Sequence, residues 1–371
     1  MTPYKVVHLT SVHSRGDTRI FVKQCRSLVA YGYSVSLVVA DGIGDEFKEG
    51  VRIVDVGKSA GRLNRMFKTT HRVFEKAVEL DADVYHLHDP ELILIGLKLK
   101  RLGKKVIFDA HEDVPQQLLA KPYLTPLLLR MLSSVFSTFE RVTCARFDGI
   151  IAATPFIRDK FLTINPLTVD INNFPVIGEL DAALPWSEKH EEVCYVGGIG
   201  TIRGIREVVR AFEFVNTPAR LNLGGRFSEQ ALEEEVKKYQ GWKRANELGF
   251  LDRMGVREVL GRSVAGLVTL HPVINYLDAL PVKMFEYMAA GIPVIASNFP
   301  FWRGIVDGND CGLCVDPLDP KAIAAAIDFM INNPERAQQM GENGKRAVLE
   351  KYNWGVEEAK LLAFYRTIFA D

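Results

Sequence analysis

The chain has 371 residues, and its 47% hydrophobic content is typical of a protein with sizeable buried cores in about two domains. Lysine plus arginine and aspartate plus glutamate number 46 each, so the formal net charge is zero and the basic excess of a nucleic-acid-binding protein is absent. Five cysteines, an odd and low count, argue against a disulfide framework and favour a cytoplasmic protein.

Strand-like and helix-like segments alternate through the first half of the chain. Short β-rich runs predict buried strands at residues 5–12, 34–40, 51–56, 83–88 and 104–110. Residues 20–32 and 91–103 carry apolar side chains at helical spacing. This alternation predicts a parallel sheet with helices on both faces, which we expect to form an N-terminal domain of residues 1–175.

The alternation restarts after a polar stretch, residues 172–191, whose proline and glycine residues indicate a join between domains. Further strands are predicted at residues 191–198, 219–225, 264–271, 292–297 and 311–316. We expect residues 176–353 to form a second domain and residues 354–371 to be a helix that packs back on the first. The predicted fold is α/β, with two Rossmann-like domains that face each other across a ligand-binding cleft.

The sequence VCYVGGIGTIRGIREVVRAF, residues 193–212, runs from an apolar strand through a glycine loop into a helix. The dinucleotide fingerprint G-x-G-x-x-G fails, because Arg203 stands where a third glycine would follow Gly198 and Gly200. Glycines let an anion approach the backbone, a helix start at Gly204 adds free N–H groups, and an arginine can fork onto a diphosphate. The alternative is a tight turn with a solvated arginine.

The sequence HPVINYLDALPVKMFEYMAAGIPVIAS, residues 271–297, is the most informative stretch. A loop that contains Asp278 leads to Pro281, a residue that is tolerated at a helix start. The predicted helix carries Lys283 and Glu286 three positions apart, and therefore on one face. A carboxylate at this place can accept hydrogen bonds from both hydroxyls of a ribose, while the loop N–H groups can bind phosphate or sugar oxygens.

Here the chain resembles the family 4 retaining glycosyltransferases of the GT-B fold. Asp278-x7-Glu286, followed by YMAAGIPVIAS, looks like the family's E-x7-E segment, and GGIGTIRGIREVVRAF is similar to its diphosphate-binding strand, loop and helix. The stretches ELGFLDRMGVREVLGRSVAGLVTLHP and DVYHLHDPELILIGLKLKRLGKKVIFDAHED match other parts of the family, so the resemblance covers nearly the whole chain. It implies a metal-independent hexosyltransferase that uses a nucleotide sugar as substrate and needs no cofactor.

The resemblance also implies roles for individual residues. Arg203 matches the basic residue on the donor diphosphate, and Glu286 the acid that binds the donor ribose. His111 matches a histidine near the donor sugar, and Asp278 the first acid of the motif, beside the reacting centre. His111, Asp278 and Arg203 are therefore the expected catalytic residues. The first acid is usually glutamate, so Asp278 is one methylene shorter than the family pattern.

Further donor-binding residues follow from the same resemblance. Gly16 matches the N-domain glycine loop beside the phosphates, and Phe250 and Leu251 match a turn that lines the base. Gly198 is also expected at the diphosphate, but the family often has a second basic residue at that position. Two cations elsewhere in the domain are candidates to supply the missing charge, namely Arg226 and Lys283.

Two stretches allow a second interpretation. His86 and His88 lie two apart on a predicted strand, so the pair can bind a metal, or one can pack while the other lines the cleft. We expect no metal. Residues 124–147 are apolar with interspersed arginines. We favour a packed core helix there over a cationic amphipathic surface that touches anionic lipid.

We therefore predict a cytoplasmic glycosyltransferase that moves a hexose from a nucleotide sugar, such as UDP-glucose, to a glycan or lipid-linked saccharide in surface or exopolysaccharide synthesis. No nucleic-acid partner is expected, and peripheral contact at the inner membrane face would suit a lipid-linked acceptor. Two alternatives stay open. One is a nucleotide-sugar epimerase on the same fold, and the other is a non-catalytic nucleotide-sugar-binding protein.

Overall fold

A computed structural model describes residues 3–119, 125–181 and 184–370. The chain divides into two compact units, the first formed by Met1–Asn173 with Val356–Asp371 and the second by Phe174–Gly355. This division falls close to the boundary expected after residue 175, and the C-terminal helix belongs to the first unit. The five cysteines, all of them in described positions, are free.

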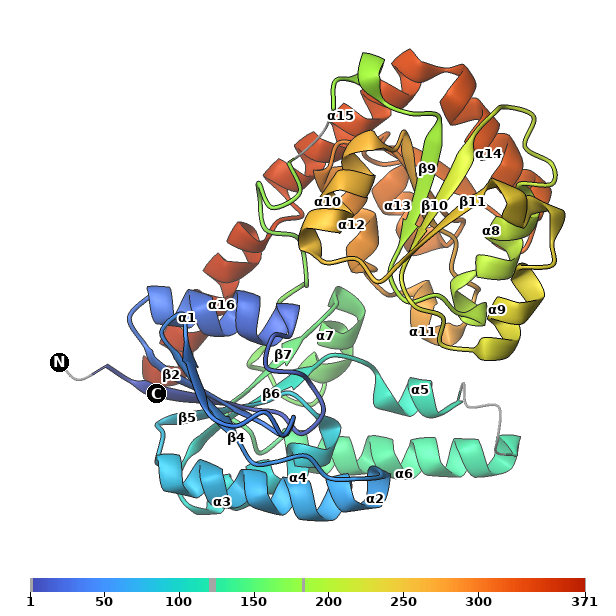
Figure 1. Cartoon of the computed structure of the whole chain (residues 1–371). Coiled ribbons are helices and arrows are strands. Elements are labelled where there is room, and N and C mark those ends of the chain that lie inside the picture. The colour runs from blue at the N-terminus through green and yellow to red at the C-terminus, as the bar shows by residue number, and fades with distance from the viewer. Residues whose placement is uncertain (1–2, 120–124, 182–183, 371) are drawn as a thin grey trace. The chain divides into compact units, whose positions relative to one another are not determined.

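The first unit is built on a sheet that, within the described residues, has eight strands in the order β3-β4-β2-β1-β5-β6-β7-β8 (Figure 1). Neighbouring strands pair in parallel, except that β3 runs antiparallel to β4 at one edge. The strands are β1 Lys5–Leu9, β2 Ser34–Val39, β3 Glu46–Lys48, β4 Val51–Asp55, β5 Val84–Leu87, β6 Lys105–Ala110, β7 Gly149–Ala152 and β8 Thr168–Asp170.

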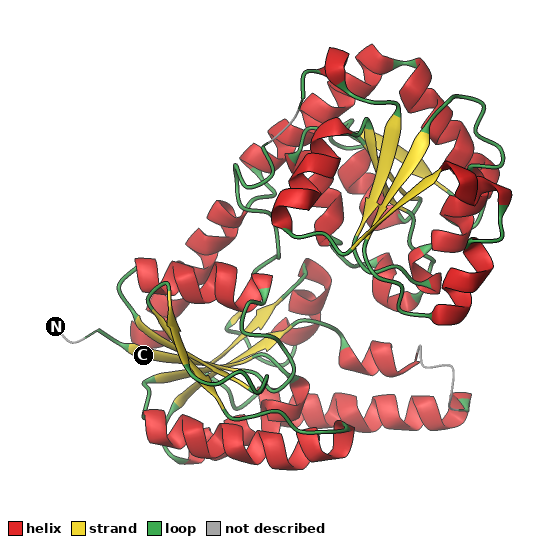
Figure 2. Ribbon diagram, viewed as in Figure 1, coloured by secondary structure: helices red, strands yellow, loops and turns green. Residues whose placement is uncertain are grey.

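Helices connect and cover these strands, as Figure 2 shows by colour. Their bounds are η1 Thr18–Cys25, α1 Arg26–Ala30, α2 Arg62–Asn64, η2 Arg65–Thr69, α3 Thr70–Leu80, η3 Pro90–Leu92, α4 Ile93–Arg101, α5 Val114–Leu119, α6 Pro126–Cys144, α7 Pro155–Leu162 and α16 Trp354–Ala370. The helix α16 is part of this unit's packing. The phenyl ring of Phe364 lies against Gly149, where an added Cβ would come within 2.5 Å of it.

The helix α6 corrects one expectation. Leu124, where that prediction began, lies outside the described residues. One face of α6 packs inward, with Leu129, Glu140, Thr143 and Cys144 buried. Its other face exposes apolar side chains, so the expectation of a core helix is wrong for that face; they are Leu127, Met131, Val135 and Val142. No helix in the described ranges is long and apolar enough to cross a membrane, and contact with lipid stays a prediction.

The second unit has a parallel sheet that, over the described part of the chain, holds six strands in the order β11-β10-β9-β12-β13-β14. The strands are β9 Glu192–Val196, β10 Arg220–Gly224, β11 Ala245–Gly249, β12 Ala265–Val268, β13 Val294–Ser297 and β14 Gly312–Val315. The helices are η4 Trp186–Glu188, η5 Thr201–Arg203, α8 Ile205–Ala211, α9 Gln230–Val236, η6 Gln240–Arg244, α10 Arg253–Arg262, α11 Ile274–Leu277, α12 Val282–Ala289, α13 Pro300–Val306, α14 Pro320–Asn332 and α15 Pro334–Glu350.

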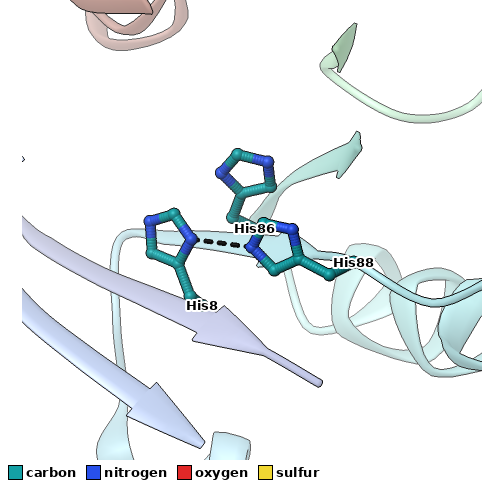
Figure 3. Close-up of side chains that lie close together, drawn as sticks. All are labelled: His8, His86 and His88. Carbon is teal, nitrogen blue, oxygen red and sulfur yellow. Dashed lines mark hydrogen bonds between the residues drawn. The ribbon is translucent and has the colours of Figure 1, made fainter. Parts of the chain in front are cut away.

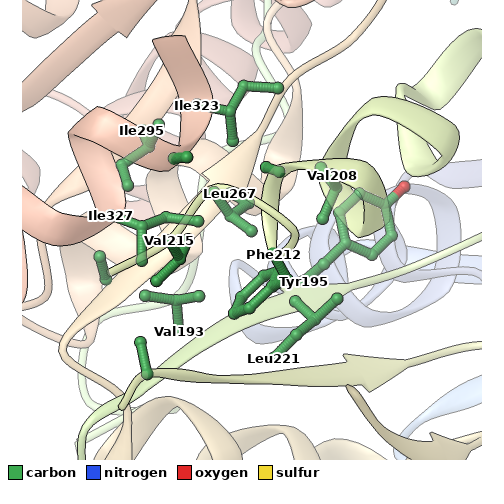
Figure 4. Packing of buried hydrophobic residues seen from close by; sticks show 14 of the residues in the cluster. Val193, Tyr195, Val208, Phe212, Val215, Leu221, Leu267, Ile295, Ile323 and Ile327 are labelled. Carbon is green, nitrogen blue, oxygen red and sulfur yellow. The ribbon is translucent and has the colours of Figure 1, made fainter. Parts of the chain in front are cut away.

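This sheet is buried on both faces. Successive side chains of a strand point to opposite faces, so Val193 and Tyr195 join one hydrophobic core and Cys194 the other. Figure 4 shows the first core, in which Phe212 packs near Val193 and Tyr195. Because both faces are filled, the loops at the strand ends are the parts of this sheet that remain for binding.

Candidate functional site

The glycine loop after β9 is held by backbone contacts that only glycine permits. Gly204 has a φ of 75°, and an added Cβ would lie 1.9 Å from the carbonyl oxygen of Thr269. Gly225 has a φ of 146°, and its Cβ would meet the carbonyl oxygen of Gly197 at the same distance. The N–H of Gly197 donates to the carbonyl of Gly224 at 2.9 Å. The loops after β9 and β10 are therefore packed tightly against each other.

Arg203 and Lys283 bring two positive charges to this loop. The Arg203 Nε lies 3.7 Å from the position of an added Cβ on Gly198. The Lys283 Nζ lies 3.6 Å from the ring centroid of Tyr195 and 3.1 Å from the position of an added Cβ on Gly197. The helix α8, by contrast, has only seven residues. The two side-chain charges, more than the helix start, therefore make this loop attractive to an anion.

Lys283 is a buried amine whose Nζ has no hydrogen-bond partner among the residues that the structure describes. The residue is 8% exposed. Burial lowers the pKa of Lys283 well below its ordinary value, and the positive charge of Arg203 lowers it further. The ring of Tyr195 offsets part of the cost of burying the cation. An anion bound at this point would offset the rest.

The helix α12 begins at Val282 after Pro281, as predicted. Glu286, one turn further, accepts a 2.6 Å hydrogen bond at Oε1 from Arg253 Nη1, and Arg253 Nε donates to Glu179 at 2.7 Å. The sequence did not reveal this partner, because Arg253 lies on a different helix. The other oxygen of Glu286, Oε2, makes no hydrogen bond within the described chain. That oxygen is available to a ligand.

Asp278 follows directly after α11. Its carboxylate has no hydrogen-bond or ion-pair partner in the described residues, whereas the neighbouring loop is fixed. The Nε1 of the buried Trp302 donates to the carbonyl of Ala279 at 2.7 Å. Asp278 therefore presents an unpaired carboxylate from a loop whose backbone is held in place.

Arg226, Phe250 and Leu251 form the end of this region. The guanidinium of Arg226 lies over the exposed ring of Phe250, 5.0 Å from its centroid. Leu251 packs against Gly224, where an added Cβ would come within 2.6 Å of it. Of the two cations considered for the charge missing at Gly198, Lys283 has its Nζ beside Gly197, whereas the guanidinium of Arg226 lies over Phe250.

In the first unit, the ends of β1, β5 and β6 bring several histidines together. Figure 3 shows His8, His86 and His88, with a 2.8 Å hydrogen bond between His8 Nδ1 and His88 Nε2. All three are buried, so the expectation that one of His86 and His88 is accessible is wrong. His88 Nδ1 lies 3.3 Å from Nε2 of His111, whose side chain is 19% exposed. Tyr365 on α16 hydrogen bonds to His86 at 2.8 Å.

Asp109 anchors this histidine cluster. Its carboxylate accepts from Arg19 Nε and Nη2 at 3.0 and 2.7 Å and from Gln24 Nε2 at 2.8 Å, and it lies 3.3 Å from His111 Nε2. Burial alone would raise the pKa of Asp109, but the charges of Arg19 and His111 outweigh it and hold the pKa well below its usual range. The carboxylate therefore stays ionised and orients the ring of His111.

The spacing within this cluster also resembles that of metal ligands. Three atoms lie 3.3 to 3.4 Å from one another, namely His88 Nδ1, His111 Nε2 and Asp109 Oδ2. Three ligands of a tetrahedrally coordinated metal ion can have this spacing. However, Oδ2 already accepts hydrogen bonds from Gln24 and Arg19, which use its two lone pairs. Hydrogen bonds thus account for the arrangement, and the absence of a metal stays a prediction.

Gly16 lies exposed in the loop before η1, between two residues whose charges are engaged locally. Arg15 donates to Asp41 at 2.7 and 2.8 Å. Asp17 caps η1 by accepting from the N–H groups of Arg19 and Ile20. The loop is therefore well ordered by its own hydrogen bonds, and its role beside the phosphates stays a prediction.

Two family models match the chain. The model described as "Glycosyltransferase Family 4" matches residues 15–169, and the model described as "Glycosyl transferases group 1" matches residues 176–347. Together they cover most of both units. The chain belongs to the family 4 glycosyltransferases. A relative from Methanocaldococcus jannaschii, named an uncharacterized glycosyltransferase, is 23% identical to it over 301 residues, which are 73% of this chain and 72% of the relative.

Solved structures share the fold of this glycosyltransferase. The sucrose-phosphate synthase of Thermosynechococcus elongatus has a TM-score of 0.79 at 21% identity and is covered over 99% of both chains. Anabaena Alr3699/HepE, in complex with UDP and glucose, has a TM-score of 0.76 at 14% identity, over 98% of this chain and 100% of that one. WaaG has a TM-score of 0.73 at 15% identity, over 96% and 98%. The predicted GT-B fold, with two Rossmann-like domains, is confirmed.

Acidification is expected to destabilise the first unit of the glycosyltransferase. Burial lowers the pKa of His8, His86 and His88, in the last case to about 3. Below about pH 6.5 the unfolded chain binds protons that these rings do not bind when folded. The free energy of unfolding should therefore fall as the pH drops through that value, by about 1.4 kcal/mol per pH unit for each ring. Denaturant unfolding between pH 8 and pH 5 measures this slope.

His13 has the opposite effect on the pH dependence of stability, but it is one group against three. Burial alone would lower its pKa, and the hydrogen bond to Asp17 raises it above the ordinary value. We expect His86→Phe to reduce the pH slope, whereas His71→Gln, which removes an exposed histidine, should leave it unchanged. Equal slopes in the two variants would contradict the assignment.

Replacing Lys283 should improve stability and weaken anion binding. Lys283→Met keeps the length of the side chain and removes a buried amine that has no hydrogen-bond partner in the described residues, so we expect the free energy of unfolding to rise by about 1–3 kcal/mol. The affinity for inorganic pyrophosphate should fall about 10- to 150-fold. Chemical denaturation and titration calorimetry measure the two effects. Lys345→Met is the matched control, since Lys345 is partly exposed and paired with Asp181; a stability gain of the same size there would count against the interpretation.

Proposed function

We propose that the second unit binds the diphosphate of a nucleotide sugar at its glycine loop and that the enzyme transfers a hexose from this donor to a saccharide acceptor. The observation that carries the proposal is the buried Lys283 amine beside Gly197, which has no hydrogen-bond partner in the described part of the chain, with Arg203 next to it. The negative charge of a diphosphate would provide these two basic side chains with an anionic partner. A ribose in the adjoining position would donate its hydroxyls to the free oxygen of Glu286.

The donor is proposed to be a UDP-hexose such as UDP-glucose. Two structures of one fold neighbour support this, since HepE was solved in complex with UDP and glucose and also with UDP-glucose. The exposed ring of Phe250, with Arg226 over it, is an apolar surface on which a base can stack. The acceptor is proposed to be a glycan or a lipid-linked saccharide of a surface polysaccharide, since the neighbour WaaG is described as involved in lipopolysaccharide biosynthesis.

The proposed transfer proceeds with retention and without an enzyme nucleophile. The acceptor hydroxyl oxygen forms a bond to the anomeric carbon, the bond from that carbon to the diphosphate oxygen breaks, and the hydroxyl proton moves to the departing diphosphate. Arg203 and Lys283 would stabilise the negative charge that develops there. The unpaired Asp278 carboxylate is proposed to position the sugar, and His111, oriented by Asp109, to contact it.

These two cations take the place of the divalent ion that neutralises phosphate charge in many other nucleotide-dependent enzymes. The proposal is therefore metal-independent transfer, with activity that persists in EDTA. An epimerase would change the sugar of the donor with no acceptor present, which NMR of the donor would reveal. A binding protein without activity would leave the donor intact with every acceptor.

Removing the charged side chain proposed to bind the diphosphate, or the one proposed to bind the ribose, should weaken the binding of UDP. Arg203→Ala and Glu286→Ala each delete a charged hydrogen-bonding group, which typically costs about 1.5–3 kcal/mol, or about 10- to 150-fold in affinity for UDP. Titration calorimetry measures the loss. The matched controls are Arg210→Ala on α8 and Glu234→Ala on α9, both exposed, which should bind UDP as the natural protein does. If both site variants also did so, the assigned site would be rejected.

A further inference from the structure

A second group of unpaired positive charges lies in the first unit, between β4 and α3. The described residues there form a cavity of about 520 Å³, which we call the basic pocket. Four basic side chains, one hydroxyl and one amide line it, together with an alanine and without a carboxylate; they are Lys58, Ser59, Asn64, Lys68, His71 and Arg72.

The charge of the basic pocket is not balanced nearby. No aspartate or glutamate occurs in the sequence between Asp55 and Glu75. Within the described chain, Lys58, Lys68 and Arg72 have no carboxylate at ion-pair distance, and His71 alone of the lining cations reaches one, at Glu75 on α3. Like charges in one cavity repel each other, so the pocket is favourable for an anion that neutralises them.

Arg72 is held in position before any ligand arrives. Its Nη2 donates to Ser59 Oγ at 2.5 Å, and Ser59 Oγ also accepts from Thr69 Oγ1 at 2.8 Å. The backbone of Gly57, with a φ of 77°, passes so close that an added Cβ would lie 3.2 Å from Arg72 Nη1. The Nε of Arg72 is buried and has no partner among the described residues. A fixed guanidinium with an unused donor is suited to a tetrahedral oxyanion.

We propose that the basic pocket binds a phosphate group carried by an organic molecule. Three cations with no carboxylate at ion-pair distance in the described chain match the charge of a phosphomonoester, about −1.5 to −2 near pH 7, better than the single charge of a carboxylate. The cavity volume lies within the range for small-molecule sites and exceeds the size of an inorganic ion. The pocket therefore has room for the group to which the phosphate is attached.

The basic pocket lies at the edge of the sheet where ligands bind in parallel α/β folds. Lys58 and Ser59 follow the C-terminal end of β4, at the edge where the loops after β1 and β6 also start. Arg65 Nε donates to Glu91 at 3.1 Å, and Glu91 accepts from Ser11 Oγ at 2.6 Å, which links the helix beside the pocket to the loop after β1. We therefore assign the phosphate to the acceptor substrate, and this assignment rests on the proposed function. The binding of a phosphate group in the basic pocket does not depend on that function.

The test measures two phosphate probes with the full chain in saturating UDP, so that the glycine loop is filled. Glucose 6-phosphate is titrated by calorimetry, and vesicles with phosphatidylglycerol are compared with vesicles of phosphatidylcholine alone by co-sedimentation. The variant is Lys58→Gln/Lys68→Gln, whose two positions are exposed, so the fold should persist. Lys76→Gln is the matched control, because Lys76 lies on α3 and is paired with Glu79 at 2.6 Å.

We expect the double variant to bind at least one probe about ten-fold or more weakly, with UDP affinity and unfolding temperature unchanged. A loss for glucose 6-phosphate identifies a soluble phosphate ester, and a loss for anionic vesicles identifies a lipid headgroup; either result supports the pocket. If the natural protein binds neither probe, or the double variant binds both as the natural protein does, the proposal is overturned. Arg203→Ala, tested without UDP, should retain probe binding at the basic pocket, which separates this result from a failure of the donor site.

Discussion

The second unit carries a protonatable amine at a place where the protein offers it only an aromatic ring. Lys283 lies above Tyr195, and Tyr195 in turn donates its hydroxyl hydrogen to the carbonyl of Gly198 at 2.7 Å. The ring is part of the hydrophobic core, so the amine cannot move toward the core, and the glycine loop closes its other side. Such a site is less stable empty than filled. The tight turns at Gly204 and Gly225 matter because they keep the loop at this distance from the amine.

In the first unit, by contrast, the buried charge of Asp109 is fully satisfied by hydrogen bonds within the protein. Asp109 has no access to solvent, but Arg19 and Gln24 satisfy its carboxylate within the protein. The rings of His86 and His88 stay neutral around it, as their lowered pKa values require. Polar groups of this kind specify one arrangement of the strand ends and leave little affinity for a ligand. The central strands of the two sheets follow the same order, yet the first sheet ends in a satisfied network and the second in a buried amine without a hydrogen-bond partner in the described residues.

Local patterns were sufficient for most of the fold. Most strands of the two sheets are buried on both faces, so they appear as apolar runs, and the expected ones are present. The edge strand β3 was missed, because its three residues are exposed and carry no apolar signal. The strand β11 was missed for a related reason, since most of its residues are only partly buried. The strands β7 and β8 were not predicted either, although β7 is fully buried.

The site was harder to predict, because it depends on contacts between residues that are far apart in the sequence. The helix start at Val282 and the glycine turns follow from local sequence. The choice between Lys283 and Arg226 does not, since it depends on whether a side chain lies over Tyr195 or over Phe250. The pairing of Glu286 with Arg253 joins two residues that are 33 positions apart in the sequence and lie on different helices. The buried His86 is hydrogen bonded to Tyr365 at the far end of the chain.

That last contact has a consequence for the order in which the protein is made. The whole of the second unit is inserted between β8 and α16 of the first. A ribosome therefore releases nearly all of the N-terminal unit, then a complete second unit, before Phe364 and Tyr365 emerge to cover Gly149 and His86. Until then the larger sheet lacks the packing of Phe364 against Gly149 and the hydrogen bond between Tyr365 and His86. Truncation at the C-terminus would accordingly damage the unit that is synthesised first.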